Sequence, residues 1–321
     1  PRDQLHPTPL AGAGPSAPGD AKFGPPVTGS EKWYEKLVYM ADGVLFEDDV
    51  LQIGLKSEYQ NNVGRLAMYF GNKTQSQLQN FSVATQVPPE VAVSTAMALA
   101  STIAPVTQVQ QLFNIECRRQ FSAPVLIRVA FTSTGGPQSF VLRAPVTLNK
   151  FVEPISLAGP DFFGRWKQIG GPPKEVQVIF AANSAGQNAI PAVKRLVAGF
   201  RFGVLVGVDP NLNNVVGAGI LSVAGGKIGC LLRLEPNFDK KVRNLRIVHN
   251  QAPVDGVVSH LTSGGLGGRR GRGVWGPDEL FAWCGELCLA LQMFRLTVRS
   301  TDESVSETIK SLLVASLTTL V

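Results

Sequence analysis

The chain has 321 residues, of which 44% are hydrophobic and 17% charged, with 33 glycines, 22 prolines and four cysteines. This composition argues against a largely disordered chain and a disulfide scaffold, and the length predicts two domains. No run in the sequence approaches the roughly 20 apolar residues that a helix needs to span a membrane. The net charge of +6 comes from 30 basic and 24 acidic residues interspersed along the sequence, which argues against a polybasic surface for nucleic acid.

Residues 1–32 are predicted to be a flexible hinge. The first 30 residues contain seven prolines and five glycines, a composition typical of an extended linker. The chain opens on Pro1 without an initiator methionine or a signal sequence, so we expect it to be the C-terminal part of a longer protein. A tether of this kind favours an interaction module, because it raises the effective concentration of whatever follows it.

Short strands are predicted between residues 44 and 143. Apolar side chains alternate with polar ones in several runs, for example at Leu51, Ile53 and Leu55, and turn residues separate the runs. Several short alternating strands within about 100 residues predict a β-sandwich, which we place in residues 33–150.

Residues 151–321 are predicted to form a second domain of helices and strands. Residues 161–169 have helical spacing and end at Gly-Gly-Pro, and residues 175–180 are interpreted as a second helix. A last helix is predicted to begin with a capping box from Ser304 to Glu307. Strands are expected at 200–206, 215–223, 228–234 and 294–298. Helices beside a short antiparallel sheet make an α+β platform.

Residues 242–292 interrupt this pattern, because they lack periodicity and contain a cluster of glycines and arginines. Two histidines and two cysteines in this segment would supply four zinc ligands by number, but their spacing matches neither a zinc finger nor a zinc ribbon: His249, His260, Cys284 and Cys288. A GxGxxG match at 271–276 follows no predicted strand. We therefore expect no metal and no cofactor. With only three arginines, the cluster is more simply interpreted as a solvated loop, but it leaves open an alternative function, a nucleic-acid-binding module that uses the basic surface and this loop.

No catalytic site is predicted. The three histidines lie in the hinge and in residues 242–292, so neither predicted domain offers a histidine base for a nucleophile. We therefore expect a protein that is not an enzyme.

Residues 161–169 combine aromatic and charged side chains. On a helix, Phe162, Trp166 and Ile169 share one face, whereas Phe163 is displaced toward the neighbouring stripe. A core helix is the simplest interpretation, but one stripe cannot bury four large apolar side chains. At least one aromatic ring is therefore expected at the surface.

Two late strands turn charged residues to one side of the predicted sheet. The two-residue period places Arg233 and Glu235 on one face of the first strand. In the second strand it places Arg295, Thr297 and Arg299 on one face. If both strands neighbour the helix, arginines edge an aromatic cleft. Such a cleft suits a short peptide that carries an aromatic anchor beside a carboxylate.

Eight blocks of the sequence, in chain order, extend this interpretation. They read ADGVLFEDDVLQIGLKSEYQ, GRLAMYFGNKT, FNIEC, PVTLNKF, DFFGRWKQ, VDPNLNNVVGAGI, IGCLLRLEPN and MFRLTVRS. These blocks resemble the C-terminal appendage of alpha-adaptin, the large subunit of the clathrin adaptor complex that works at the plasma membrane. The resemblance covers residues 33–235 and resumes at residue 293.

The resemblance implies an all-β immunoglobulin-like sandwich followed by an α+β platform, an antiparallel sheet with helices, on a flexible hinge. It implies a clathrin adaptor appendage that recruits endocytic accessory proteins through short linear motifs during clathrin-mediated endocytosis and vesicle transport. The implied partners are these accessory proteins, the other adaptor-complex subunits through an absent trunk and, indirectly, the clathrin coat, with no nucleic acid. The implied location is peripheral, on the cytoplasmic side of the plasma membrane in clathrin-coated pits.

Two peptide sites follow from the resemblance. The platform site takes DPF, DPW and FxDxF peptides, and its members match Phe162, Phe163, Trp166, Arg233, Glu235, Arg295 and Arg299. The sandwich site takes WVxF peptides, and its members match Lys56, Tyr69, Gly71 and Gln108. The usual aromatic residue of the sandwich site is phenylalanine, so Tyr69 keeps the ring and adds a hydroxyl.

The chain departs from the family in residues 242–292. In the family only a few residues join the two flanking strands, so this chain has roughly fifty additional residues. A retained intron is our hypothesis, because Val242-Arg243 can be encoded by a splice-donor-like sequence and Gln292 by an acceptor-like one. When translated, the segment is predicted to be a disordered loop that could separate Arg233 from Arg295.

Overall fold

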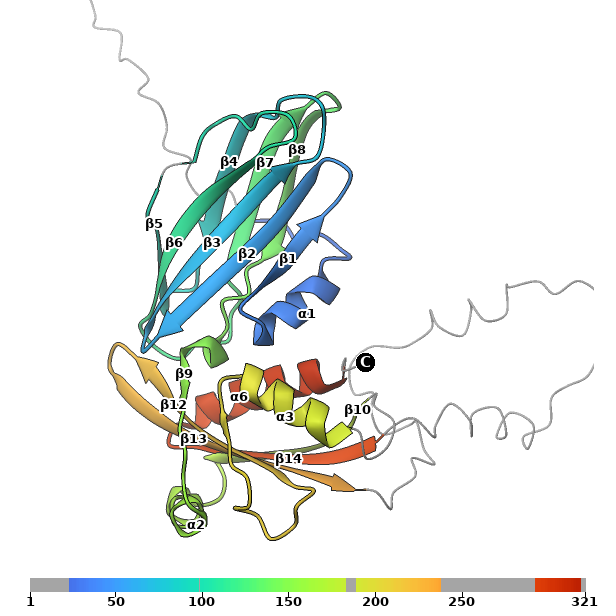
Figure 1. Cartoon of the computed structure of the whole chain (residues 1–321). Helices are drawn as coiled ribbons and strands as arrows, with labels where there is room; N and C mark the ends of the chain where they lie inside the picture. Colours follow the sequence, from blue (N-terminus) through green and yellow to red (C-terminus); the bar gives the residue numbers. More distant parts are fainter. Residues whose placement is uncertain (1–22, 98, 183–188, 238–291, 319–321) are drawn as a thin grey trace, which may run out of the picture.

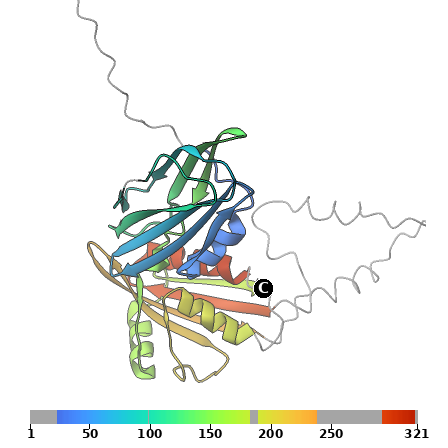
Figure 2. The same cartoon turned by 45° about the horizontal axis from the view of Figure 1, so that its top comes forward.

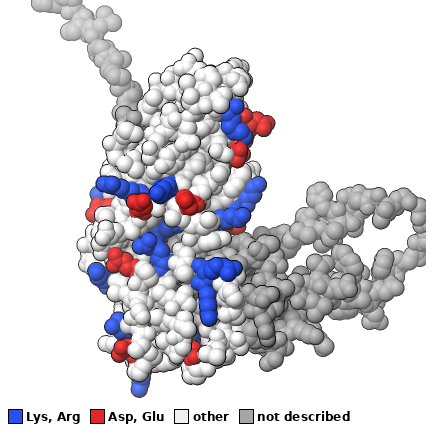
Figure 3. Space-filling model, in the orientation of Figure 1, with Lys and Arg blue, Asp and Glu red and all other residues white. Residues whose placement is uncertain are grey.

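The computed structural model describes residues 23–97, 99–182, 189–237 and 292–318. These residues form a β-sandwich that stands on an α+β platform (Figure 1), as the sequence predicts. Most of the predicted hinge and nearly all of the predicted insertion lie outside the described residues. Within the described part of the chain, no helix is long and apolar enough to cross a membrane. Basic and acidic side chains lie near one another on the face shown in Figure 3.

The sandwich consists of two antiparallel sheets, with the strand orders β1-β2-β3-β6-β5 and β4-β7-β8. Alternate apolar side chains, such as Leu51, Ile53 and Leu55 of β2, are buried between the sheets. Helix α1 begins inside the predicted hinge and contacts β1 and α6. The bounds are Glu31–Tyr39 (α1), Asp42–Glu47 (β1), Leu51–Gln60 (β2), Val63–Asn72 (β3), Gln79–Gln86 (β4), Val91–Thr95 (β5), Gln108–Cys117 (β6), Leu126–Ser133 (β7) and Gly136–Arg143 (β8).

The platform is an antiparallel sheet with the strand order β10-β14-β13-β12-β11, and β9 also pairs with β12. Helices α3 and α6 lie between this sheet and the sandwich, and α2 lies on the opposite face (Figures 1 and 2). The bounds are Leu148–Phe151 (the 3-10 helix η1), Val152–Pro154 (β9), Gly159–Ile169 (α2), Glu175–Ala182 (β10), Ala189–Gly199 (α3), Gly203–Val204 (β11), Val215–Val223 (β12), Gly226–Asn237 (β13), Gln292–Ser300 (β14) and Glu303–Thr318 (α6).

Two predicted elements of the platform are wrong. Residues 175–180 are not a helix but part of β10, which pairs with β14 from Glu175↔Arg299 to Ala182↔Gln292. The predicted strand at 200–206 shrinks to β11, because Phe200 and Arg201 form a turn directly after α3 and Arg201 has a φ of 65°.

The last helix also begins differently from the prediction. The Oδ1 atom of Asp302 accepts hydrogen bonds from the backbone N–H of Ser304 at 3.0 Å and of Val305 at 3.4 Å. It also accepts one from the Ser304 hydroxyl at 2.7 Å. Asp302 is therefore the N-cap, a position that favours aspartate because its carboxylate satisfies free N–H groups of the first turn.

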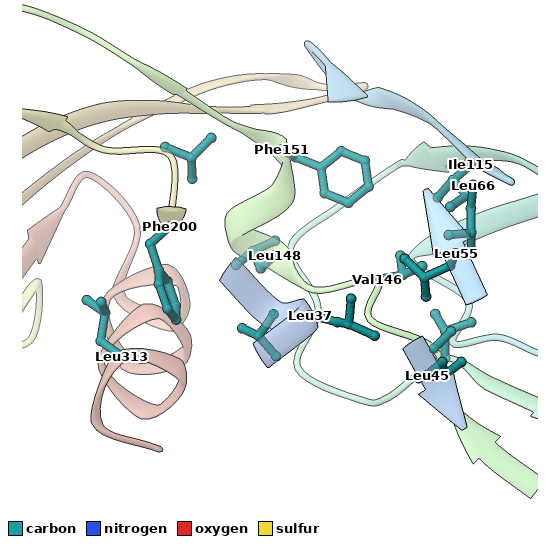
Figure 4. Close-up of a cluster of buried hydrophobic side chains, with 14 of the residues drawn as sticks. Leu37, Leu45, Leu55, Leu66, Ile115, Val146, Leu148, Phe151, Phe200 and Leu313 are labelled. Carbon is teal, nitrogen blue, oxygen red and sulfur yellow. The ribbon is translucent and has the colours of Figure 1, made fainter. Parts of the chain in front are cut away.

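One hydrophobic core runs through both predicted domains (Figure 4). Phe200 and Leu313 of the platform, Leu37 of α1 and Phe151 of η1 belong to the same buried cluster as Leu55 of the sandwich. The predicted boundary between residues 150 and 151 falls inside η1, which lies in the middle of this cluster. The sandwich and platform are therefore packed together through α1, η1 and α6.

Candidate functional site

Helix α2 is fixed to the outer face of the platform sheet by Phe162. This side chain is 0% exposed and packs against Leu205, Val216 and Leu231. A proline in the first turn and Gly170, at a φ of 84°, mark the two ends of the helix. Burial of a phenylalanine of this kind stabilises a fold by about 2 kcal/mol or more.

Trp166 and Phe163 extend from this anchor toward the surface. The Trp166 ring stacks on Phe162 with ring centroids 5.5 Å apart, and Phe163 meets Phe162 edge-on at 5.3 Å. Phe163 is 40% exposed, whereas Trp166 is partly buried. Phe162 has no exposed surface, so in any binding site it supports the other two rings and does not contact a ligand itself.

Arg299 connects the aromatic rings to the sheet. Its guanidinium lies 4.4 Å from the centroid of the Trp166 ring, within the range of a cation–π interaction. The same guanidinium donates to the backbone carbonyl of Trp166 and to the carboxylate of Glu175. Arg299 is therefore held in place by two partners and in turn fixes the position of the Trp166 ring.

The remaining charged residues form a chain of ion pairs along β13 and β14. Arg233 pairs with Asp209 at 2.7 Å and with Glu235 at 2.9 Å, and Glu235 also pairs with Arg295 at 2.6 Å. With Glu175 beside Arg299, three arginines face three carboxylates, so this surface is balanced in charge. The sequence predicts the arginines at the edge of the cleft but not the carboxylates Asp209 and Glu175, which pair with Arg233 and Arg299.

The ion pairs shift the pKa values of Asp209 and Arg295. Burial opposes ionisation of Asp209, but hydrogen bonds from Arg233, from the backbone of Asn211 and from Asn214 outweigh it and lower the pKa of the carboxyl. The hydrogen bond to Glu235 raises the pKa of Arg295. The side chain of Arg295 is 51% exposed, against 31% for Arg233 and 16% for Arg299, so it is the arginine most open to a ligand.

The segment between β13 and β14 does not separate the two arginines that flank it. Glu235 of β13 lies directly opposite Arg295 of β14 in the sheet, and Arg233 contacts the same carboxylate. The predicted platform residues Phe163, Trp166, Arg233, Glu235, Arg295 and Arg299 therefore lie on one face of the sheet, with Phe162 beneath them.

The four predicted sandwich residues lie on the outer face of the larger sheet. Tyr69 and Gly71 belong to β3, Gly71 is paired with Gln108 of β6, and Lys56 comes from β2. Lys56 and Gln108 are exposed and Tyr69 is partly buried. Lys56 forms one ion pair, with Glu58 at 3.8 Å, so its ammonium remains largely in solvent.

The motifs that suggested other functions lie outside the described residues. These are the glycine- and arginine-rich cluster, the GxGxxG match and the four candidate zinc ligands His249, His260, Cys284 and Cys288. In the residues that the structure does describe, no three His, Cys, Asp or Glu side chains gather into a group that could hold a metal ion.

A β-sandwich joined to an α+β platform with an aromatic helix on its outer face is the fold of an adaptor appendage. Residues 41–145 match the family model of the adaptin C-terminal domain, and residues 150–265 match that of the C-terminal domain of alpha adaptin AP2. Together these matches cover more than half of the chain, which therefore belongs to the alpha-adaptin C-terminal domain family.

Three relatives are similar over about two thirds of this chain. The AP-2 complex subunit alpha-2 of Dictyostelium discoideum is 35% identical over 231 residues, which are 71% of this chain and 23% of that protein. The AP-2 complex subunit alpha of Schizosaccharomyces pombe is 32% identical over 216 residues, 67% of this chain and 24% of that protein. The AP-2 complex subunit alpha-1 of Arabidopsis thaliana is 32% identical over 203 residues, 63% and 20% respectively. The chain thus spans less than a quarter of the length of these relatives.

Among solved structures, the GAE domain of GGA2p from Saccharomyces cerevisiae is similar to part of this chain. It is 15% identical, with a TM-score of 0.30, and the match covers 33% of this chain and 97% of that domain.

Proposed function

We propose that this chain is a non-enzymatic clathrin adaptor appendage that recruits endocytic accessory proteins through short peptide motifs. It acts as part of an adaptor complex at clathrin-coated pits, on the cytoplasmic side of the plasma membrane, and reaches the clathrin coat indirectly. Its family membership supports this role, and the observation that carries it is the aromatic and charged surface on α2, β13 and β14.

The platform surface suits an aromatic anchor next to a carboxylate. Phe163 offers a 40% exposed ring, and Trp166 is held by stacking and by the Arg299 guanidinium, so little side-chain entropy is lost when a ligand binds. Aromatic and arginine residues of this kind dominate the energy of most protein interfaces. We assign DPF, DPW and FxDxF peptides to this surface.

The acidic residue of such a peptide is expected to contact Arg295 first. Arg233 and Arg299 are occupied by internal carboxylates, whereas Arg295 shares its one carboxylate with Arg233 and is the most exposed of the three. A peptide carboxylate at Arg295 competes with Glu235 for the same guanidinium. Binding of a short peptide is therefore expected to be only micromolar.

A second peptide, of the WVxF type, is assigned to the sandwich surface of Lys56, Tyr69, Gly71 and Gln108. Because Gly71 has no side chain, a ligand can approach the backbone of β3 between the Tyr69 ring and Gln108. Lys56 lies on the same outer face and can attract an acidic residue next to the motif.

Calorimetric titration of the full chain with an FxDxF peptide tests the platform assignment. Trp166→Ala is expected to weaken binding roughly thirtyfold, the effect of losing about 2 kcal/mol. Trp33→Ala is the matched control, because Trp33 is also partly buried and its ring also has a cation, that of Lys32, at 4.4 Å. Equal binding by the wild type and the Trp166 variant would refute the assignment.

Two further titrations separate the remaining alternatives. A WVxF peptide should still bind the Trp166 variant and lose affinity with Tyr69→Ala, if the two sites are independent. A single-stranded oligonucleotide that binds in a strongly salt-dependent manner, and equally well with Trp166→Ala, would instead favour the nucleic-acid-binding alternative.

A further inference from the structure

A cavity of about 280 Å³ lies where the sandwich meets the platform, away from both proposed peptide sites. Its lining comes from the end of α1, from β2, from η1 and from the segment after α3, and it includes Lys150 and Arg201. Such a volume can hold a phosphate group together with several water molecules, since one water occupies about 30 Å³.

Lys150 and Arg201 bring two positive charges to this cavity without a carboxylate partner. Lys150 is only 3% exposed, and neither side chain forms an ion pair with any of the described residues. A buried ammonium without a counter-ion is costly, and buried lysines are normally paired. Burial, reinforced by the nearby Arg201, lowers the pKa of Lys150 to about 7.

Backbone carbonyls account for only part of the hydrogen-bonding capacity of these two groups. Lys150 Nζ donates to the carbonyl of Met40 at 2.6 Å. Arg201 donates from Nε to the carbonyl of Val152 at 2.7 Å and from one terminal nitrogen to that of Tyr59 at 3.3 Å. An ammonium and a guanidinium together have several more donors, and these remain unpaired among the described residues.

The electrostatic balance of the cavity is positive. Helices α1 and α3 both end beside it, and each C-terminus contributes roughly half a negative charge. Below pH 7, where Lys150 is charged, the two positive charges therefore leave a surplus of about one. Glu58 also lines the cavity, but its side chain is 74% exposed and is paired with Lys56 at 3.8 Å, so its carboxylate is turned away into solvent.

We propose that this cavity binds a phosphate group, which accepts hydrogen bonds from Lys150 and Arg201 at the junction between sandwich and platform. A phosphate monoanion, the main form of inorganic phosphate below pH 7, matches the surplus of about one charge and can accept from the ammonium and the guanidinium at once. The group comes either from a free phosphate or from a lipid headgroup that carries a phosphate monoester. The site is independent of the proposed peptide binding.

Titration of the full chain with inorganic phosphate, at constant ionic strength and below pH 7, tests the proposal. Saturable binding is expected, with Lys150→Met weakening it roughly ten- to hundredfold, the effect of removing a charged hydrogen bond. Lys227→Met, which removes an exposed lysine from the start of β13, should leave the affinity unchanged within about twofold. The absence of saturable binding, or equal binding by wild type and Lys150→Met, would overturn the proposal.

A second measurement on the wild type guards against a folding defect in the variant. In ¹H–¹⁵N spectra of lysine side chains, phosphate should raise the pKa of the Lys150 ammonium, because an adjacent anion favours the charged form. An unchanged titration of Lys150 in saturating phosphate would contradict the proposal. Sedimentation with phosphatidylcholine vesicles, with and without a phosphatidylinositol monophosphate, separates the two sources of the phosphate group. Capture of the chain by the phosphoinositide vesicles that depends on Lys150 identifies the lipid headgroup, and no capture identifies free phosphate.

Discussion

Lys150→Met is expected to stabilise the fold at pH 7 and to leave its stability almost unchanged at pH 10. Burial lowers the pKa of this lysine from 10.5 to about 7 in the folded chain. Between these two values the unfolded chain binds more protons than the folded chain, so wild-type stability rises with pH across this window. The cost of Lys150 is therefore fully present below pH 7 and fades as the pH approaches 10.5.

The size of this effect follows from the same two values. Each tenfold change in protonation corresponds to about 1.4 kcal/mol, so burial of Lys150 costs about 4 kcal/mol at pH 7 and about 1 kcal/mol at pH 10. Methionine fills a similar volume but loses the hydrogen bond to the Met40 carbonyl, worth about 1 kcal/mol. The variant should therefore gain about 3 kcal/mol in unfolding free energy at pH 7 and about zero at pH 10.

Urea unfolding of both chains at the two pH values, in buffers without phosphate, measures this difference. Lys227→Met serves as the control, because an exposed lysine should change stability little at either pH. A gain that is the same at pH 7 and pH 10 would refute the argument that Lys150 is a buried and uncompensated charge. A loss of stability at pH 7 would show that its hydrogen bond outweighs its burial.

Three further predictions concern the fold. Gly203→Ala should lower the free energy of unfolding in urea by about 3 kcal/mol, because the added Cβ would lie 2.2 Å from a carbonyl oxygen. The control Gly229→Ala, in the same sheet, should cost less than about 1 kcal/mol, because its Cβ meets nothing within 4 Å; equal costs would contradict this packing. Phe162→Ala should lower the free energy of unfolding by about 4 kcal/mol, and Phe163→Ala by less than about 1 kcal/mol. In calorimetry, Phe163→Ala should weaken FxDxF binding; the reverse order of stability effects would mean that Phe163, and not Phe162, anchors the helix. Asp302→Ala should lower stability by about 1 kcal/mol in thermal melts, and no loss would remove it as the N-cap.

The sequence predicts the β-sandwich and the α+β platform well, because the patterns that indicate them are local. The alternation of apolar residues along β2, β13 and β14 is correct, and it places Arg233, Arg295 and Arg299 on the face that carries α2. A side-chain period of two leaves only two choices of face, so parity alone carries much of this prediction.

The errors arise where a distant segment decides the outcome. Residues 175–180 form a strand because β14, more than 100 residues further along the chain, pairs with them. A short apolar run cannot be assigned to helix or strand from periodicity alone. The carboxylates Asp209 and Glu175 were missed for the same reason, since each meets its arginine only after the sheet has formed.

The buried position of Phe162 also depends on residues that are far away in sequence. Periodicity places Phe162 and Trp166 on one helical face and cannot say which ring lies deeper. Leu205, Val216 and Leu231 enclose Phe162 from the sheet and the loop beside it. Trp166, one turn further on, meets Arg299 instead.

The central claim, that α2 and β14 bind an aromatic peptide, is tested most directly by NMR of the tryptophan indole groups. The chain has four tryptophans, and an FxDxF peptide added to the ¹⁵N-labelled chain should shift the indole N–H resonance of Trp166 and the side-chain resonances of Arg295. The indole resonance of Trp33 on α1 should not move. A Trp166 resonance that stays in place while the peptide is bound would contradict the account.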